Sequence, residues 1–318
     1  MLGSVPTADQ RTPIILDCDP GHDDAVAIVV AAHTTDLLGI TTVAGNAPLE
    51  RTTHNALVMR ELLGLDLPVH SGAARPLLAE ASPAPAVHGI SGLDGADLPN
   101  PQRDVDSADA VGFIIDTCRA NEGTWIVAVG PLTNIALVLR AAPDLGRRIG
   151  GLSVMGGGSF GNRTAVAEFN IWADPEAAAA VFAYGGPLVM AGLDVTHQFL
   201  ATADRIERLA GLGGPLATVL GELLTYFSTA YIGRHDAIAG APMHDPLAVL
   251  AVVDPTLFER RYRHVAVETA GWLTRGMTVI DERQVRDRPG ANCCVLGDVD
   301  AERAFAMVVD AVSTFSPQ

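Results

Sequence analysis

The chain has 318 residues, of which 48% are hydrophobic and 18% charged, which is enough for a sizeable buried core. Its formal net charge of -16 argues against nucleic acid and anionic membranes as partners, because both repel an acidic surface. No apolar run is long enough to span a membrane, and residues 1–12 are expected to form a flexible tail, without signal-peptide order, before one domain at residues 13–318.

The first predicted element leads into a dense group of acids. Residues 14–16 are apolar and predict a buried strand, which a Pro-Gly turn ends. Asp17 and Asp19 lie before the turn, and Asp23 and Asp24 follow it at the start of an apolar helix. Four carboxylates this close together cannot all stay buried and ionised unless something compensates their negative charge. Acids and Pro-Gly pairs are also common caps and turns, but the apolar flanks favour burial and therefore a cation among the acids.

Strand and helix patterns alternate along the rest of the chain. Further strands are predicted at residues 38–44, 125–129, 152–155, 188–193, 262–269 and 277–281. Helices are predicted at residues 49–63, 107–119, 135–140, 203–210, 215–231, 247–253 and 300–312, and from Pro175 onward. This alternation indicates an α/β fold with an open, largely parallel (mixed) sheet flanked by helices. Residues 72–105 are rich in Gly, Pro, Ser and Ala and are expected to form a long loop, either functional or disordered.

Polar side chains follow several of the predicted strands. Asn46, Thr133, Asn134 and the loop at residues 156–170 all come after such strands. Because ligands of open α/β sheets bind beyond the carboxyl ends of the strands, these residues should face one crevice together with the acids. That crevice would contain hardly any lysine or arginine. It therefore suits a neutral, hydroxyl-rich molecule beside a divalent metal better than a phosphorylated one.

Five motifs occur in order along the chain. They are Asp17-Cys18-Asp19-Pro20-Gly21-His22-Asp23-Asp24, Thr42-Val43-Ala44-Gly45-Asn46, Gly130-Pro131-Leu132-Thr133-Asn134, Ala167-Glu168-Phe169-Asn170 and His244-Asp245-Pro246. Together they resemble the inosine-uridine nucleoside hydrolase family, over nearly the whole chain. The resemblance implies that family's Rossmann-like architecture. It also implies calcium-dependent hydrolysis of the N-glycosidic bond of ribonucleosides, giving ribose and a free base.

The resemblance further implies a Ca²⁺ site and two catalytic groups. The ion would be held by Asp19, Asp24, the main-chain carbonyl of Thr133, and Asp245, which all offer oxygen and so suit a hard cation rather than zinc. Asp19 would act as general base towards a water that the ion activates. His244 is the candidate acid for the departing base; the alternative is that it orients Asp245.

The nucleoside itself would be bound by polar and aromatic side chains. By the resemblance, the ribose hydroxyls are held by Asp23, Asn46, Asn162, Glu168 and Asn170. His88 lies in the long loop that closes over the base in relatives, although it could equally be an exposed loop histidine. Phe227, Tyr231 and His235 share a helical face by their spacing of four and are candidate base contacts. An aromatic stripe of this kind is more often part of a core, so the base preference stays open between pyrimidine and mixed use.

Other residues are given lesser roles. His22 is expected to have no chemical role, and Asp17 either completes the acidic network or accepts backbone hydrogen bonds. Asp194 and His197 are interpreted as structural. The four cysteines make no Cys-x-x-Cys pair and indicate reduced thiols in a cytoplasmic protein. The resemblance also implies a homodimer or a homotetramer.

Three other functions compete with this interpretation. A haloacid-dehalogenase-like phosphatase also places Asp-x-Asp after its first strand, but this chain has Pro20-Gly21 next and no suitable lysine for phosphate. A hydrolase of another N-riboside, such as nicotinamide riboside, would keep the mechanism and change the leaving group. A non-catalytic binder of nucleosides or sugars would need no general base, which the presence of Asp19 argues against.

Overall fold

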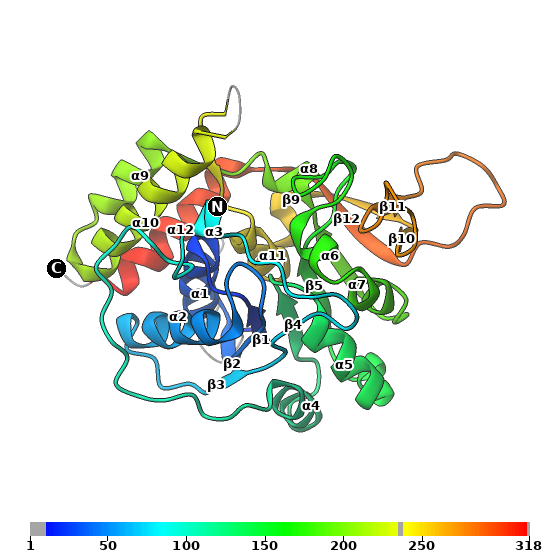
Figure 1. Ribbon diagram of the computed structural model, residues 1–318, viewed down its shortest axis with the longest axis horizontal. Coiled ribbons are helices and arrows are strands. Elements are labelled where there is room, and N and C mark those ends of the chain that lie inside the picture. The colour runs from blue at the N-terminus through cyan, green and yellow to red at the C-terminus, as the bar shows by residue number, and fades with distance from the viewer. Residues whose placement is uncertain (1–10, 235–237, 317–318) are drawn as a thin grey trace.

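An eight-stranded sheet in the order β3-β2-β1-β4-β5-β6-β12-β9 organises the molecule (Figure 1). The computed structural model describes residues 11–234 and 238–316. The strands of the sheet are β1 (Pro13–Cys18), β2 (Asp36–Thr42), β3 (Val69–Ser71), β4 (Trp125–Ala128), β5 (Gly151–Met155), β6 (Leu188–Ala191), β9 (Phe258–Arg263) and β12 (Cys293–Val299). All neighbours in it are parallel except β12 and β9, which are antiparallel. The predicted α/β fold with a largely parallel, mixed sheet is therefore confirmed.

Helices cover both faces of the sheet, and each face has its own hydrophobic core. One face carries α1 (His22–Thr34), α2 (Leu49–Leu62), α10 (Gly214–Ile232), α11 (Asp245–Val253) and α12 (Ala301–Thr314). The other carries α4 (Ala110–Ala120), α5 (Thr133–Ala141) and α7 (Pro175–Phe182). The remaining α-helices are α9 (Ala203–Ala210), which packs on α10, and the short α3 (Pro85–His88), α6 (Phe169–Ala173) and α8 (Leu193–Thr196).

Helix α1 is buried on every side. Residues 22–31 are all buried, and the helix packs against α10, α11 and α12. Its sequence is apolar all round after the first turn, which is typical of a helix in the centre of a large core. The two acids of that first turn are thereby carried into the interior.

The order of the strands creates a crevice at the end of β1. The chain runs outward from β1 through β2 and β3 on one side, and from β4 through β5 and β6 on the other. Asp17 pairs with Thr41 of β2 and Ala128 of β4, so the end of β1 lies at the point where the order reverses. Ligands of open α/β sheets bind at this point, because the connections on its two sides leave in opposite directions.

The C-terminal part differs most from the sequence-based expectation. Strand β12 was not predicted, yet it lies between β6 and β9 and is buried at residues 293–297. The single strand expected at residues 262–269 is two strands: β9 joins the main sheet, and β10 (Val265–Val267) pairs with β11 (Thr278–Ile280) in a projecting hairpin (Figure 1). A short apolar run such as Cys293–Leu296 has no alternating pattern, and it becomes a strand only because the sheet covers it on both sides.

Smaller departures lie near the crevice. Residues 72–105 include the short helix α3, which ends at His88. Helix α5 begins two residues earlier than predicted, so Thr133 belongs to its first turn. Strands β7 (Leu200–Thr202) and β8 (Gly240–Pro242) form a separate pair. Within the described residues, none of the helices combines the length and apolar character needed to cross a bilayer.

Candidate active site

Asp19 directly follows β1, and its carboxylate lies between two glycines. Asp19 Oδ2 accepts a hydrogen bond from the backbone N–H of Asn46 at 2.6 Å. A Cβ atom at Gly130 would lie 2.6 Å from Asp19 Oδ1, and one at Gly45 would overlap Asp19 Oδ2. Glycine is therefore required in both the Gly45-Asn46 and the Gly130-Pro131 motifs, because any side chain there would displace the carboxylate.

Three further acids meet beside Asp19. Asp23 and Asp24 come from the first turn of α1 and Asp245 is the first residue of α11; each offers a carboxylate oxygen within 4.8 Å of the others. Asp24 also fixes the turn, since its carboxylate accepts from the N–H groups of Gly21 (2.8 Å) and Asp19 (3.2 Å). The expected pair Asp24 and Asp245 is thus brought together, with Asp23 beside them.

Burial raises the pKa values of all four acids, and repulsion from neighbouring carboxylates adds to this for Asp19, Asp23 and Asp245. Burial raises the pKa of Asp24 to about 6, and burial together with Asp24 raises the pKa of Asp23 to about 8. Burial followed by Asp24 raises the pKa of Asp19 well above its usual value, and burial followed by Asp23 does so for Asp245. The protein alone therefore holds these carboxylates at a high electrostatic cost, which a cation would remove.

The residues fit a hard divalent cation. Asp23, Asp24 and Asp245 offer carboxylate oxygens within 4.8 Å of one another, and a cation among them would balance their charge. Asp19 Oδ1 is buried and has no hydrogen-bond partner. A buried carboxylate oxygen without a donor is costly, and a metal ion supplies the missing positive charge. Thr133 is also buried, and its hydroxyl donates to Asp174 at 2.7 Å, so its side chain serves a neighbouring loop.

Asp17 lies on β1 two residues before Asp19 and has different partners. Its Oδ1 accepts from the hydroxyl of Thr41 (2.5 Å) and from the side-chain amide of Asn134 (2.8 Å). The Asn134 amide also donates to the carbonyl of Thr42, so this network joins β1, β2 and α5. Burial raises the pKa of Asp17 to about 6. These contacts point to a role in holding the strand ends together.

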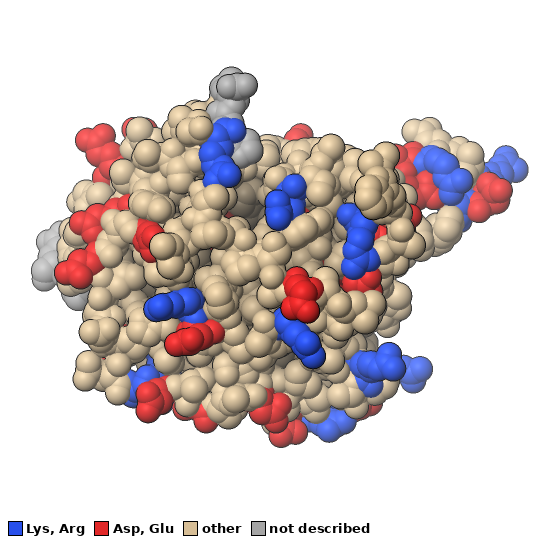
Figure 2. Space-filling model, viewed as in Figure 1, with Lys and Arg blue, Asp and Glu red and all other residues tan. Residues whose placement is uncertain are grey.

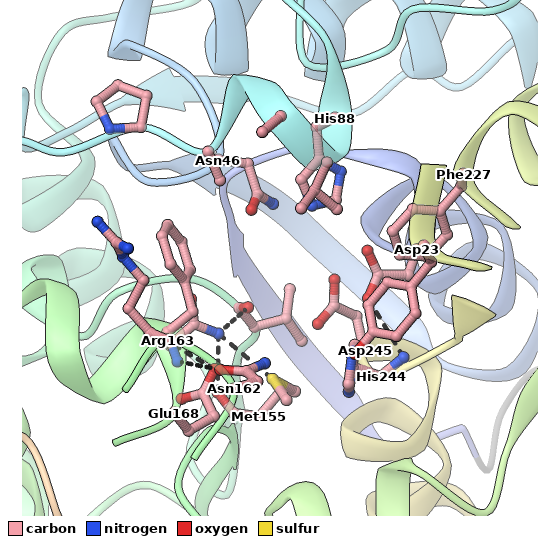
Figure 3. A pocket seen from close by; sticks show the side chains of 18 of the residues that line it. Asp23, Asn46, His88, Met155, Asn162, Arg163, Glu168, Phe227, His244 and Asp245 are labelled. Atoms are coloured by element: carbon pink, nitrogen blue, oxygen red, sulfur yellow. Dashed lines mark hydrogen bonds between the residues drawn. The ribbon is translucent and has the colours of Figure 1, made fainter. Parts of the chain in front are cut away.

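A pocket of about 470 Å³ lies above the acid cluster (Figure 3). Eight of the nine substrate residues expected from the sequence line it, together with the candidate acid and one candidate metal ligand: Asp23, Asn46, His88, Asn162, Glu168, Asn170, Phe227, Tyr231, and then His244 and Asp245. These residues come from segments between positions 23 and 245, and the fold brings them around one cavity. The remaining candidate base contact, His235, lies outside the described residues. The long loop also contributes residues 83–87 to the wall.

Two polar side chains are held rigidly on one side of the pocket. The side-chain amide of Asn170 donates to the carbonyls of Val129 (2.9 Å) and Met155 (3.2 Å), and so spans the ends of β4 and β5. Glu168 precedes α6, and its carboxylate accepts from three backbone N–H groups, those of Gly157, Asn170 and Ile171. Burial nevertheless raises the pKa of Glu168 to about 7. Asn162 Oδ1 accepts from the N–H of Phe169.

His244 lies on the opposite side, next to Asp23. Its backbone N–H donates to Asp23 Oδ2 at 3.2 Å, and its Nδ1 lies 2.7 Å from the hydroxyl of Thr196 at the end of α8. Burial, with the nearby His197, lowers the pKa of His244 to about 3. The imidazole is thus neutral, and it can offer an N–H to a leaving group when Thr196 donates to its Nδ1.

The structure adds residues that the sequence reasoning missed. Thr196 holds His244, and Arg163 and Arg234 line the pocket, although hardly any arginine was expected there. Arg163 lies over the ring of Trp172 at 4.1 Å, and Arg234 donates to the carbonyl of Ala86. None of these residues belongs to one of the five motifs, so no sequence signal distinguished them.

On the face shown in Figure 2, acidic and basic side chains are interspersed rather than gathered into a basic patch.

Comparisons with known proteins agree on one family. Residues 14–306 match the family model described as "Inosine-uridine preferring nucleoside hydrolase". The chain is 43% identical over 310 residues to the pyrimidine-specific ribonucleoside hydrolase RihA of Escherichia coli (strain SMS-3-5 / SECEC), covering 96% of this chain and 99% of that protein. It is 45% identical over 296 residues to RihA of Salmonella typhimurium, covering 91% and 94%.

Solved structures with this fold are also similar. The purine-preferring ribonucleoside hydrolase from Gardnerella vaginalis matches with a TM-score of 0.90 and 33% identity, covering 96% of this chain and 99% of that chain. The plant nucleoside hydrolase PpNRh1 matches with a TM-score of 0.87 and 30% identity, covering 95% and 99%.

Proposed function

Since the chain belongs to the inosine-uridine preferring nucleoside hydrolase family, we propose that it is a calcium-dependent hydrolase with a preference for pyrimidine ribonucleosides. As a member of this family it is an N-ribosyl hydrolase, which releases ribose and a free base. The preference for pyrimidines, the calcium ion and the residue roles below are the proposed parts. RihA, the pyrimidine-specific relative, supports the first of them.

The observation that carries the proposal is the unpartnered Oδ1 of Asp19 beside the acid cluster, below a pocket lined by hydroxyl-binding side chains. We assign the ion to Asp19, Asp24, Asp245 and the main-chain carbonyl of Thr133. A calcium ion bound there would orient a water molecule and lower its pKa. A binding protein without catalysis would not require a buried, poorly solvated carboxylate at this position.

The protein's own groups supply the remaining chemistry. Asp19 is the general base, because its buried carboxylate lies beside the site assigned to the ion and can take a proton from a water held there. The negative charge of the cluster favours the positive charge that develops on the ribose ring in an oxocarbenium-like transition state. Asp23, Asn46 and Asn170 hold the sugar, and their fixed hydrogen bonds orient it for attack.

The leaving base would be met by the other side of the pocket. His244 is assigned as the group that donates a hydrogen bond to the departing base, positioned by Thr196. Phe227 and Tyr231 are assigned to the base itself, since both line the pocket from α10. Burial keeps His244 neutral, so it assists the departing base by donating a hydrogen bond from its ring N–H while its Nδ1 accepts from the hydroxyl of Thr196.

The test is ribose release, measured as reducing sugar, from uridine, cytidine, inosine and adenosine with and without chelator. We expect calcium-dependent release that is fastest for uridine and cytidine. Faster release from the purine nucleosides would overturn the proposed base preference. No release from any of the four, with nucleoside binding still measured by calorimetry, would favour the non-catalytic binder or another N-riboside.

The cellular setting is a proposal too. We propose a cytoplasmic location, because the four cysteines are buried free thiols, as expected in a reducing compartment. We also propose a homo-oligomer, which is supported by the likeness to the family alone. Light scattering of the purified protein measures its state of association directly.

A further inference from the structure

The hairpin of β10 and β11 carries two large apolar side chains that are almost fully exposed. Among the described residues, the four most exposed large apolar side chains are those of Trp272 (96%), Ile90 (82%), Leu273 (80%) and Leu78 (77%). Trp272 and Leu273 are adjacent in the turn of the hairpin, which projects from the molecule beside α7 (Figure 1). Contact with another apolar surface would remove this indole ring from water, which is favourable.

An apolar groove lies next to this turn, between α5 and α7. Its volume is about 540 Å³, which is within the range of cavities that hold a drug-sized ligand, so it can accept an indole side chain. Its walls are mostly apolar and include Leu77, Leu78, Leu137, Leu139, Ala180 and Tyr184.

The hairpin turn and the groove are both fixed to the start of α7. Arg275, in the turn, forms a bidentate ion pair with Glu176 (2.7 and 2.9 Å), and Glu176 also lines the groove. The backbone N–H of Leu77 donates to Asp174 Oδ2 at 2.8 Å, directly before α7. Trp272, Leu273 and the groove therefore form one continuous surface, which we call the α7 face.

A face that carries both a protruding side chain and a groove can bind a copy of itself. A two-fold dimer uses the same patch on both copies, so Trp272 of each would enter the groove of the other. Specific interfaces bury about 800 Å² on each partner. A tryptophan side chain can bury about 150–250 Å² of this, and each copy adds Leu273, Leu78 and the walls of its groove.

Charge also favours the α7 face over the rest of the surface for contact between copies. The chain has a net charge of -16, which opposes the approach of two copies. Residues 258–292, which include the hairpin, instead contain seven arginines and five acids. The groove has one charged residue of each sign, Arg140 and Glu176. Two copies that meet here therefore do so through a part of the surface without the acidic excess.

We propose that the α7 face is the contact between two copies of this chain, with Trp272 of each copy inserted into the groove of the other. This inference rests on the proposed homo-oligomer and identifies the surface that forms it. An anionic membrane is the other partner that a tryptophan beside arginines suits, but the acidic net charge of the chain opposes it.

Replacing the inserted side chain tests the contact. Trp272→Ser removes a side chain that contributes little to the core of one copy, because it is 96% exposed, and circular dichroism checks that the variant is folded. In sedimentation equilibrium of the full chain, we expect association to weaken by at least about 30-fold, the effect of losing an interface hot spot. Association as tight as that of the wild type would overturn the inference.

The groove is tested separately by Ala180→Arg. Ala180 is exposed on α7, so the substitution places a long charged side chain in the groove and leaves Trp272 unchanged. It should weaken association as Trp272→Ser does; an unchanged association would mean that the groove is not the seat of Trp272. Ile90→Ser is the matched control, since Ile90 is as exposed but lies two residues after His88, outside the α7 face. An equal loss of association in this control would also overturn the inference.

The wild type separates failure of this face from failure of the proposed oligomer. If the wild type associates and Trp272→Ser and Ala180→Arg associate equally well, only the α7 face is wrong. If the wild type is a monomer at every concentration, both proposals are wrong. Binding of that monomer to phosphatidylserine vesicles, with loss of binding in Trp272→Ser, would assign the face to a membrane instead. None of these outcomes depends on whether nucleosides are hydrolysed.

Discussion

The two sides of the pocket are built in different ways. The floor consists of acids and amides at the ends of β1, β4 and β5 and at the starts of α1 and α11, and backbone groups hold them in place. The opposite wall is made by His88, at the end of the short helix α3 within the long loop, and by Phe227 and Tyr231 on α10, where rings contact rings. Strand ends in a sheet are fixed by the whole fold, whereas a loop and a helix face can change without disturbing it. We therefore expect the floor to carry the chemistry of hydrolysis and the wall to affect the choice of base.

Removing the metal tests the floor as a whole and should have the largest effect. A chelator should abolish nucleoside hydrolysis, since four carboxylates would again face each other without a cation. It should also lower the melting temperature by about 5 °C, because a ligand that binds only the folded state stabilises it. Activity assays and calorimetry measure the two effects, and adding calcium back should restore both. An unchanged melting temperature and unchanged activity would remove the metal from the mechanism.

Asp19→Asn tests the floor at one atom. It should lower kcat by about 10³-fold, a typical effect of losing a general base, while nucleoside binding by calorimetry changes little. Asp17→Asn is the matched control, because Asp17 lies two residues earlier, on β1, but contacts Thr41 and Asn134 instead. We expect the control to lower stability more than turnover. Comparable kcat values for wild type and Asp19→Asn would contradict the assignment of the base.

His244→Ala tests the boundary between floor and wall. It should lower kcat on uridine by roughly 10²-fold and affect p-nitrophenyl riboside far less, because p-nitrophenolate leaves without a proton donor. Thr196→Val removes the hydroxyl that contacts His244 Nδ1 and nearly preserves its volume. It should cause a smaller loss in the same direction, roughly fivefold. Equal losses on both substrates would mean that His244 orients Asp245.

Glu168→Gln tests the polar part of the floor through the pH dependence of stability, and it should have the smallest effect. The pKa of Glu168 is about 7 in the folded protein, against a usual value of 4.5, so the folded state binds more protons between these values. Wild-type stability should therefore fall as pH rises from 4.5 to 7, by at most roughly 3 kcal/mol from this group. In Glu168→Gln this contribution to the fall in stability with rising pH should be absent. Melting temperatures at pH 5 and pH 8 in excess chelator measure it.

The exposed Glu80 provides the control for this experiment. Glu80→Gln removes the same charge but should leave the pH dependence of the wild type. If Glu168→Gln retained the full slope, the buried carboxylate would not be its source.

Comparison of the sequence with the structure separates the same two regions. The acids around the Pro20-Gly21 turn were recognisable because strand, turn and helix start lie within a dozen residues. Strand β12 was missed because Cys293–Leu296 has no periodicity. Of its two neighbours β6 and β9, β6 is also more than a hundred residues away along the chain. The contact between Thr196 and His244 was missed for a similar reason, since the two residues are 48 positions apart.

The sequence by itself determined the α/β fold, the acid cluster and the positions of the polar pocket residues. Local patterns suffice for these features, because parallel strands bring their carboxyl ends, and the motifs that follow them, to one edge of the sheet. Only the tertiary structure decided which side chains surround His88, what holds His244 and how Asp17 differs from Asp19. Each of these depends on a contact between side chains from distant segments, and the spacing of residues along the chain carries no information about such contacts.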